Sequence, residues 1–422
     1  MQFLGRPLYY GWYVVAAIAG MNFANSATAI GVLTIFVVPL TAEFGWSRTQ
    51  VSAVTSLGAI LGANAAPFTG RITDKLGARL PLTLGGLLIV IATLHLATMR
   101  SLPWFYVAFG LARLADQAFV QAPSPPAVAK WFQRYRGRAL AFLFFASSAG
   151  GVVMPLLVHL VIEAWHWRTA WFVLGGIMLV VGLLPCAFLV RRQPEDLGVP
   201  IDGISAPAPG QNPSSEAAAE PCYDVNTWEL REAFGTSSYW LLLAAVFGFG
   251  IASTGVGLHL VPHLIQQGLA SAAAVGAVSI GSLASAAATF VWGFGAERWS
   301  ARRLLIMALT VKAVSLAVLL GANTVLAAYS YAMLQGFAEA GLRTMITIVL
   351  GDYYGRQHLG SIYGVMRSVQ VSGFALGPLV SGATFDLVQS YQKAFLSFLL
   401  LSIVGMGLVA LTQRPLKKSA NA

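Results

Sequence analysis

The sequence has few charged residues and almost no cysteine. Of its 422 residues 10% are charged, and Cys186 and Cys222 are the two cysteines. A soluble domain carries about 25% charged residues, so this chain lacks the polar groups to cover its surface in water. Two cysteines exclude a disulfide framework, and a hydrophobic content of 57% excludes intrinsic disorder. We therefore expect the chain to fold in a lipid bilayer.

Long apolar runs fill most of the chain. A transmembrane helix needs roughly 20 apolar residues, whereas the strands of a membrane β-barrel alternate over about 10 residues. The runs are continuous, which predicts an all-α membrane protein with twelve transmembrane helices. The predicted spans are residues 11–40, 50–70, 80–99, 103–128, 139–162, 168–190, 238–266, 272–295, 303–321, 324–350, 360–385 and 391–411.

The positive charges are unevenly distributed between the predicted loops. Of 26 Lys and Arg residues, four lie in outer loops and four within spans, which leaves 18 on the inner side. The positive-inside rule then predicts that both termini are cytoplasmic. This placement also accounts for the net charge of +10 without a nucleic-acid partner. The outer cations are Arg48, Arg100, Arg168 and Lys393, and those within spans are Arg113, Lys312, Arg343 and Arg367. The first span follows no cleavable leader, so we expect it to be retained in the cytoplasmic membrane.

A polar, proline-rich stretch at 191–235 divides the chain into a bundle at 1–190 and a second at 236–422. It reads as a cytoplasmic linker, mobile at least over 206–220. The two bundles repeat each other. Gly70 and Gly293, Asp74 and Glu297, Gly150 and Gly373, and Pro155 and Pro378 are each 223 positions apart, and Trp131-Phe132 matches Tyr353-Tyr354 at 222. A constant shift is typical of a duplicated bundle with a binding site between its halves.

Two loops of this repeat carry a family resemblance. The segment from Gly70 through Asp74 to Arg79 resembles the signature loop of the major facilitator superfamily, and Gly293 to Arg303, with Glu297 and Arg298, resembles its second copy. Glycines let helices approach closely. We expect Asp74 to meet a helix N-terminus and the basic loop 134–138, and so to hold the inner side shut. The candidate gating residues are Gly70, Asp74, Arg79, Glu297, Arg298 and His259.

Within the superfamily the chain is similar to the bacterial monocarboxylate porters and oxalate/formate exchangers. This resemblance implies small carboxylates as cargo, moved with protons or by exchange. The arginine that many members carry in the eighth span is replaced here by Thr289, and the first span has no lysine, so the usual carboxylate clamp is not transferable. The matching segments are Tyr9-Tyr10-Gly11-Trp12, Gly45-Trp46-Ser47-Arg48, Trp131-Phe132, Arg136-Gly137, Pro194-Glu195-Asp196-Leu197-Gly198, His259-Leu260-Val261-Pro262-His263 and His358-Leu359-Gly360-Ser361-Ile362.

Charges within the bilayer are the candidate site residues, because burying one costs at least about 2.5–3.5 kcal/mol. Glu339 and Arg343 are four apart on the tenth span, so we expect them to lie on one face, close enough to pair. One interpretation is that Arg343 receives a substrate carboxylate while Glu339 takes a proton. The alternative is a permanent ion pair between helices.

The fourth span carries a second set of polar residues. Asp116 in this span is equivalent to Glu339 in the second bundle, because the two are 223 positions apart. Arg113, Gln117 and Gln121 follow one another in steps of four, which predicts a polar helix face toward a water-lined cavity. Interhelical hydrogen bonds would leave the same pattern. We expect polar side chains of the first and eleventh spans opposite it. Arg367 is either a second anion contact or a helix-end cation, and Lys312 is read as structural. The candidate substrate-binding residues are Arg343, Arg113, Arg367, Gln117, Gln121, Asn22, Asn25 and Gln370, with Glu339 and Asp116 for proton coupling.

His259 and His263 lie one helical turn apart near the outer side. A metal site would need a third ligand or an intervening glutamate, so we expect no metal. Two interpretations remain for these rings. His259 is a pH-responsive contact at the outer gate, or both histidines have a packing role.

These features predict a secondary transporter that moves a small organic anion by alternating access, with protons or a counter-substrate, as a monomer without cofactor. An exporter of a larger, weakly polar compound is the alternative, because small residues surround Ser282 and Ser285. A membrane sensor is a third, for which the chain after Arg414 is too short to form an output domain.

Overall fold

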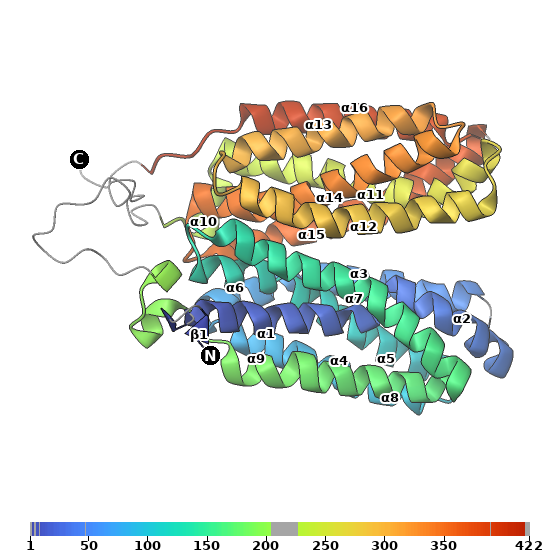
Figure 1. The fold of residues 1–422 in the computed structure, drawn as a ribbon, viewed down its shortest axis with the longest axis horizontal. Coiled ribbons are helices and arrows are strands. Elements are labelled where there is room, and N and C mark those ends of the chain that lie inside the picture. The colour runs from blue at the N-terminus through green and yellow to red at the C-terminus, as the bar shows by residue number, and fades with distance from the viewer. Residues whose placement is uncertain are drawn as a thin grey trace, which may run out of the picture.

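The computed structural model describes residues 2–3, 6–7, 9–46, 48–203, 227–388 and 390–417. They form two bundles of helices that lie side by side (Figure 1). Helix α1 (Tyr10–Asn25) begins and helix α16 (Gln392–Leu411) ends at the same end of the molecule. We call this the terminal end; the sequence predicts that it is cytoplasmic.

The first bundle contains six spans, three of them interrupted. A 3₁₀ turn breaks the first span, and seven residues of π-helix interrupt the fourth, followed by Pro123, Pro125 and Pro126. π-Segments are rare and concentrate at functional sites. The elements are α1, η1 (Ser26–Thr28) and α2 (Ile30–Phe44); α3 (Arg48–Leu76); α4 (Arg79–Ala97); α5 (Leu102–Leu114), η2 (Ala115–Gln121) and α6 (Ser124–Trp131); α7 (Arg136–Ala164); and α8 (Trp167–Ile177), η3 (Met178–Leu183) and α9 (Leu184–Leu189).

The second bundle is built from unbroken helices. Its spans are α11 (Ser237–Gln266), α12 (Ser271–Gly295), α13 (Ala301–Leu320), α14 (Val325–Tyr354), α15 (Leu359–Val388) and α16. Short elements lie outside the spans: the two-residue strands β1 (Gln2–Phe3) and β2 (Arg6–Pro7), the 3₁₀ turns η4 (Pro194–Leu197) and η5 (Ile201–Gly203), and α10 (Leu230–Phe234).

The all-α prediction with twelve spans in two bundles is confirmed. Eight of the described helices are long and apolar enough to cross a membrane by composition alone. The other four spans are those that contain α1, α3, η2 and α14, which are interrupted or carry polar residues. Helix α3 packs on α15, and α7 packs on α12, so these two helix pairs join the bundles.

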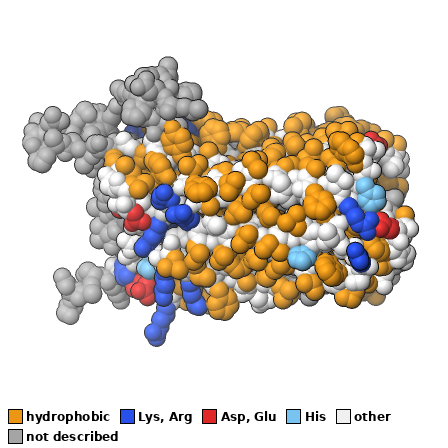
Figure 2. Space-filling view, turned by 90° about the horizontal axis from the view of Figure 1, so that it is seen from below, with side chains coloured by type: hydrophobic (Ala, Val, Ile, Leu, Met, Phe, Trp, Pro, Cys, Tyr) orange, Lys and Arg blue, Asp and Glu red, His pale blue; other side chains and the backbone are white. Residues whose placement is uncertain are grey.

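The outside of the bundle is apolar, as a lipid-facing surface requires. Large side chains such as Val107, Leu160 and Leu283 are exposed. Figure 2 shows hydrophobic side chains along the length of this face, with Lys and Arg gathered mainly near the terminal end.

The linker is partly ordered where the structure describes it. The Asp202 carboxylate accepts hydrogen bonds from the backbone N–H groups of Gln133, Arg134 and Tyr135, which fixes η5 against the start of α7. The stretch predicted to be mobile, 206–220, lies outside the described residues.

Candidate substrate site and gate

Two connected cavities lie between the bundles. The outer cavity has a volume of about 440 Å³, and the inner cavity, nearer the terminal end, has a volume of about 230 Å³. Both are lined by Ser147 of α7 and by Glu339 and Arg343 of α14. The inner cavity also receives Gln121, Tyr363, Arg367 and Gln370, together with aromatic side chains of both bundles.

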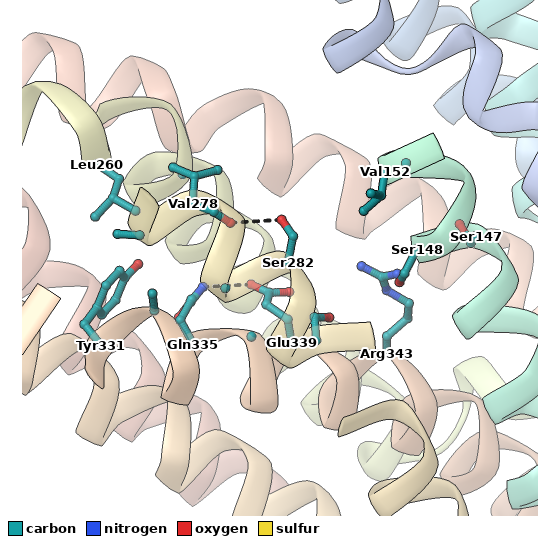
Figure 3. Close-up of a pocket in the computed structure, with 17 residues that line it drawn as sticks. Ser147, Ser148, Val152, Leu260, Val278, Ser282, Tyr331, Gln335, Glu339 and Arg343 are labelled. Carbon is teal, nitrogen blue, oxygen red and sulfur yellow. Dashed lines mark hydrogen bonds between the residues drawn. The ribbon is translucent and has the colours of Figure 1, made fainter. Parts of the chain in front are cut away.

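Arg343 faces the cavities without a counter-charge. Its side chain is exposed, and no other described residue forms a hydrogen bond or ion pair with its guanidinium. Figure 3 shows it directed toward Ser147 and Ser148 and away from Glu339. Its Cζ lies 5.8 Å from the centre of the Phe144 ring, a cation–π contact that leaves its N–H groups available.

Arg367 is the second cation of the inner cavity. Its guanidinium donates to the side-chain oxygens of Gln370, at 2.6 Å, and of Gln117 on the first bundle, at 3.0 Å. Its Nε is buried with no hydrogen-bond partner among the described residues. Arg367 is therefore held by neutral amides and does not extend toward the helix end as a snorkelling cation would.

Asp116 is neutralised within the first bundle. Its carboxylate accepts hydrogen bonds from Arg113 at 2.5 Å, Gln117 at 2.7 Å and Asn25 at 2.6 Å. Asn22 instead donates to the Ser124 hydroxyl at 2.9 Å. These side chains are buried, and the Asp116 carboxylate is satisfied within the first bundle, whereas Asn25 Oδ1 and Arg113 Nε have no hydrogen-bond partner among the described residues. Gln117 accepts from Arg367 and so links this network to the second bundle.

The predicted polar face of the fourth span needs correction. Gln121 lines the inner cavity, whereas Arg113 and Gln117 do not. The expected spacing of four assumes an α-helix, but η2 is π-helical with i→i+5 hydrogen bonds, which turns Gln121 away from the face of Arg113. Asn22, Asn25 and Asp116 likewise lie outside the cavity lining.

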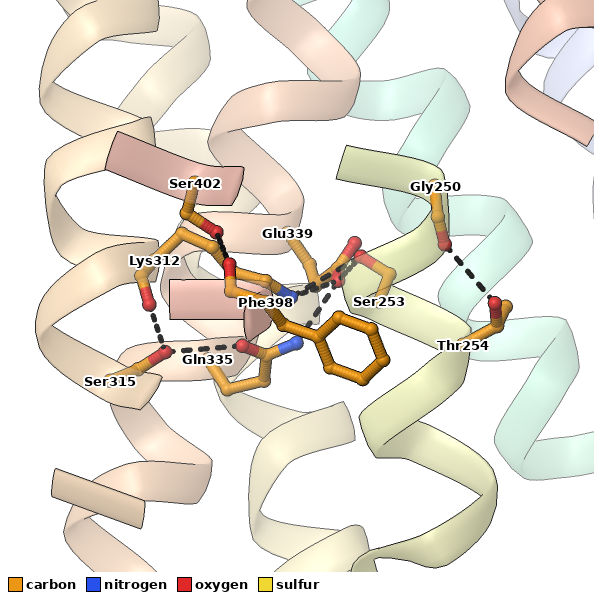
Figure 4. Close-up of polar contacts among 9 residues, drawn as sticks. All are labelled: Gly250, Ser253, Thr254, Lys312, Ser315, Gln335, Glu339, Phe398 and Ser402. Atoms are coloured by element: carbon orange, nitrogen blue, oxygen red, sulfur yellow. Dashed lines mark hydrogen bonds and ion pairs between the residues drawn. The ribbon is translucent and has the colours of Figure 1, made fainter. Parts of the chain in front are cut away.

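The predicted pair of Glu339 with Arg343 is wrong. Glu339 pairs with Lys312 of α13, whose Nζ lies 3.1 Å from its carboxylate (Figure 4). It also accepts hydrogen bonds from Gln335, at 3.0 Å, and from the Ser253 hydroxyl. Lys312 is 0% exposed, whereas the Glu339 side chain keeps 21% of its surface exposed toward the cavities. This pair was not predicted, because Lys312 was read as structural and the spacing along α14 does not report which helix lies beside Glu339.

Asp74 links the two bundles at the terminal end. Its carboxylate accepts from the backbone N–H groups of Gly360 at 2.9 Å and Ser361 at 2.6 Å, and from the Ser361 hydroxyl at 2.6 Å. Lys130 of its own bundle adds an ion pair at 3.0 Å. The expected contact with a helix N-terminus is thus present at α15, but the cation is Lys130 and not the loop 134–138.

Glu297, the repeat equivalent of Asp74, makes fewer contacts between the bundles. Glu297 pairs with Arg138 of the first bundle at 2.8 Å, but its Oε1 is buried with no partner among the described residues. Burial raises the pKa of Glu297 above its ordinary value, although Arg138 opposes this shift. Loop 134–138 therefore contacts Glu297 in place of Asp74.

Glycines allow both contacts. A Cβ at Gly70 would overlap the backbone carbonyl of Gly360, and a Cβ at Gly293 would overlap that of Gly137. Gly137 and Gly360 are themselves 223 positions apart, so the close approach is repeated with the fold. These contacts bring α3 against α15 and α12 against α7 at the terminal end.

Three predicted gate residues make no contact between bundles. Arg79 and Arg298 are exposed, with no side-chain partner among the described residues. His259 lies 3.3 Å from the Pro378 carbonyl and packs on Tyr391, both in its own bundle. Two further contacts were not anticipated: Arg136 pairs with Asp352 between the bundles at 3.0 Å, and Glu195 of the linker pairs with Arg356 of the second bundle.

Comparisons with known proteins agree with this geometry. The sequence model of the Major Facilitator Superfamily matches residues 13–284 and 242–422. The chain belongs to this superfamily. The superfamily match therefore covers both bundles and the cavities between them.

Curated relatives match nearly the whole chain. Monocarboxylate transporter 11 of Mus musculus is 26% identical over 94% of this chain and 87% of its own. The oxalate:formate antiporter of Oxalobacter formigenes is 24% identical over 91% of this chain and 88% of its own. Among solved structures, the superfamily transporter FucP in its outward conformation matches with a TM-score of 0.72 at 13% identity, covering 96% of this chain and all of that one.

Proposed function

We propose that this superfamily transporter moves a small organic anion, with a monocarboxylate as the favoured cargo. The observation that carries the proposal is the pair of cations at the inner cavity, Arg343 and Arg367, neither of which has an acidic partner among the described residues. The two membrane carboxylates nearby are already neutralised by Arg113 and Lys312. A bound anion would supply the missing counter-charge, and a guanidinium binds a carboxylate through two parallel hydrogen bonds.

Proton coupling is proposed at Glu339. It lines both cavities and is therefore within reach of water, while Lys312, Gln335 and Ser253 donate hydrogen bonds to its carboxylate. Asp116 is the second candidate, but it is 3% exposed and bound by three side chains. In this scheme the contacts of Asp74 and Glu297 hold the cytoplasmic side shut while the cavities are loaded from outside. The linker at 191–235 joins the two rocking bundles of a monomer in the cytoplasmic membrane.

The test is uptake of a labelled short monocarboxylate into proteoliposomes. Accumulation is expected with an imposed inward proton gradient, or with unlabelled carboxylate inside the vesicles if the protein works by exchange. Arg343→Gln should abolish uptake, and Arg298→Gln, which removes an exposed arginine outside the cavities, should preserve it. Equal uptake by wild type and Arg343→Gln would contradict the proposal.

One observation favours a second cargo class. The outer cavity is lined mostly by small residues, among them Gly281, Ser282 and Ser285. This wall would accept a larger, weakly polar compound, which the exporter alternative requires. Efflux of neutral compounds that survives Arg343→Gln would favour that alternative.

A further inference from the structure

A third polar cavity lies at the terminal end and shares no lining residue with the other two. Its volume is about 530 Å³, which is within the range of small-molecule sites. It is lined from both bundles by four arginines and a single carboxylate. These residues are Arg136, Arg302, Arg356, Arg414 and Asp352. We call it the arginine cavity.

Arg136 is the arginine of the first bundle, and it is held rigidly. It is 7% exposed, its Nη1 pairs with Asp352 at 3.0 Å, and its Nε donates to the Phe132 carbonyl at 3.3 Å. A Cβ at Gly351 would lie 2.6 Å from Nη1, so the missing side chain lets the guanidinium rest against the backbone of α14. This arginine is therefore in place before any ligand arrives.

The other three arginines come from separate parts of the second bundle. Arg302 donates to the backbone carbonyls of Val409 and Ala410 at the end of α16. Arg356 donates to the Lys130 carbonyl at 3.1 Å and pairs with Glu195. Arg414 is exposed, with no hydrogen-bond or ion-pair partner among the described residues. Among the described residues, and counting Glu195 with Asp352, the arginine cavity carries two positive charges in excess.

We propose that the arginine cavity binds a phosphate-bearing anion with at least two negative charges, and that its occupancy holds the terminal end closed. Guanidinium groups match the planar, bidentate geometry of phosphate oxygens, and several converging arginines favour a multiply charged anion over a monocarboxylate. The ligand would bridge Arg136 of the first bundle to Arg302 and Arg414 of the second. These groups must separate when the bundles part at this end, so the bound anion favours the closed state.

The same phosphate chemistry is offered by a soluble diphosphate and by an anionic lipid headgroup, and two assays separate these sources. The first is a thermal shift of the full-length protein with pyrophosphate at constant ionic strength, where we expect a saturable rise in melting temperature. The second uses nanodiscs of phosphatidylcholine with or without cardiolipin, whose headgroup carries two phosphates, with retained lipid measured by native mass spectrometry.

The variants form a matched set. Arg414→Gln should raise the dissociation constant about tenfold, because it removes a charged donor without breaking a described hydrogen bond or ion pair. Arg302→Gln should raise the dissociation constant by a similar factor. The control variant is Arg303→Gln, because Arg303 is an exposed neighbour that does not line the cavity. Arg343→Gln should retain binding in full, which keeps this site distinguishable from the substrate site.

Closure is measured separately. Pyrophosphate on the cytoplasmic side should slow the labelling of cysteines introduced between the bundles at the terminal end several-fold in wild type, and not in Arg414→Gln. The site is supported if pyrophosphate or the anionic lipid binds saturably, and if Arg414→Gln weakens this binding while Arg303→Gln preserves it. The site is refuted if neither pyrophosphate nor cardiolipin binds, or if Arg303→Gln weakens binding as much as Arg414→Gln. Binding that leaves labelling unchanged overturns the closing role.

Discussion

Replacing Lys312 by methionine tests the buried ion pair directly. Methionine is one heavy atom shorter than lysine and carries no charge, so the change leaves Glu339 as an unpaired carboxylate beside Ser253 and Gln335. Breaking a buried pair costs about 3–5 kcal/mol, because the remaining charge is left without compensation. Glu339 keeps 21% of its side chain exposed, so water offsets part of this cost, and we expect a loss of about 2–4 kcal/mol.

Thermal unfolding in detergent measures this loss. Cys186 is 0% exposed, so a thiol-reactive dye reports unfolding in a Cys222→Ser background. At about 2–4 °C per kcal/mol for a bundle of this size, Lys312→Met should lower the apparent melting temperature by roughly 5–15 °C.

The double variant is the decisive comparison. Lys312→Met with Glu339→Gln removes both charges, and replacing a buried pair with neutral residues is often close to neutral for stability. We expect the double variant to recover most of the loss. A melting temperature as low as that of Lys312→Met alone, or no change in the single variant, would refute the role given to this pair.

Three further predictions concern the gate and the outer side. Asp74→Asn should shift the protein toward the state open at the terminal end more than Glu297→Gln does, as read by cysteine labelling at that end; equal shifts would contradict the difference in their contacts. Gly137→Val should block close approach to Gly293 and reduce transport strongly, and normal rates would show that the contact is dispensable. Hydrogen bonds from Arg168 and Trp167 hold the pKa of Glu43 below its ordinary value of 4.5. The ionised Glu43 therefore contributes to folding stability above pH 4.5, and this contribution is lost as the pH falls below 4.5. Glu43→Gln should lower the melting temperature by about 1–3 °C at pH 7 and by less at pH 4.

The sequence was sufficient to predict the architecture because the bilayer imposes it. Span length and the repeat at 223 positions are both one-dimensional patterns that can be read from the sequence. The same repeat relates Gly70 to Gly293 and Gly137 to Gly360, so the close approach of the bundles was implied by positions of glycine alone.

The polar contacts could not be predicted in the same way. Helical spacing placed Glu339 and Arg343 on one side of α14, but it does not report which neighbouring helix lies nearest to each. Lys312 is 27 residues away in sequence, and only the packing of α13 on α14 brings it to Glu339. The π-helical turn in η2 is similarly invisible to a rule based on steps of four, so Gln121 and Arg113 were placed on one face.

The gate is symmetric in its backbone and unequal in its charges. Asp74 has four donors, from α15 and Lys130, whereas Glu297 has Arg138 and a buried oxygen without a partner. Hydrogen bonds to a charged group contribute about 1.5–3 kcal/mol each, so the α3–α15 side is the stronger half of the closure. Separation of the bundles should therefore begin between α7 and α12. Helix α7 also carries Ser147, which faces Arg343 across the cavities, so cargo bound to Arg343 would act first on the weaker side of the gate.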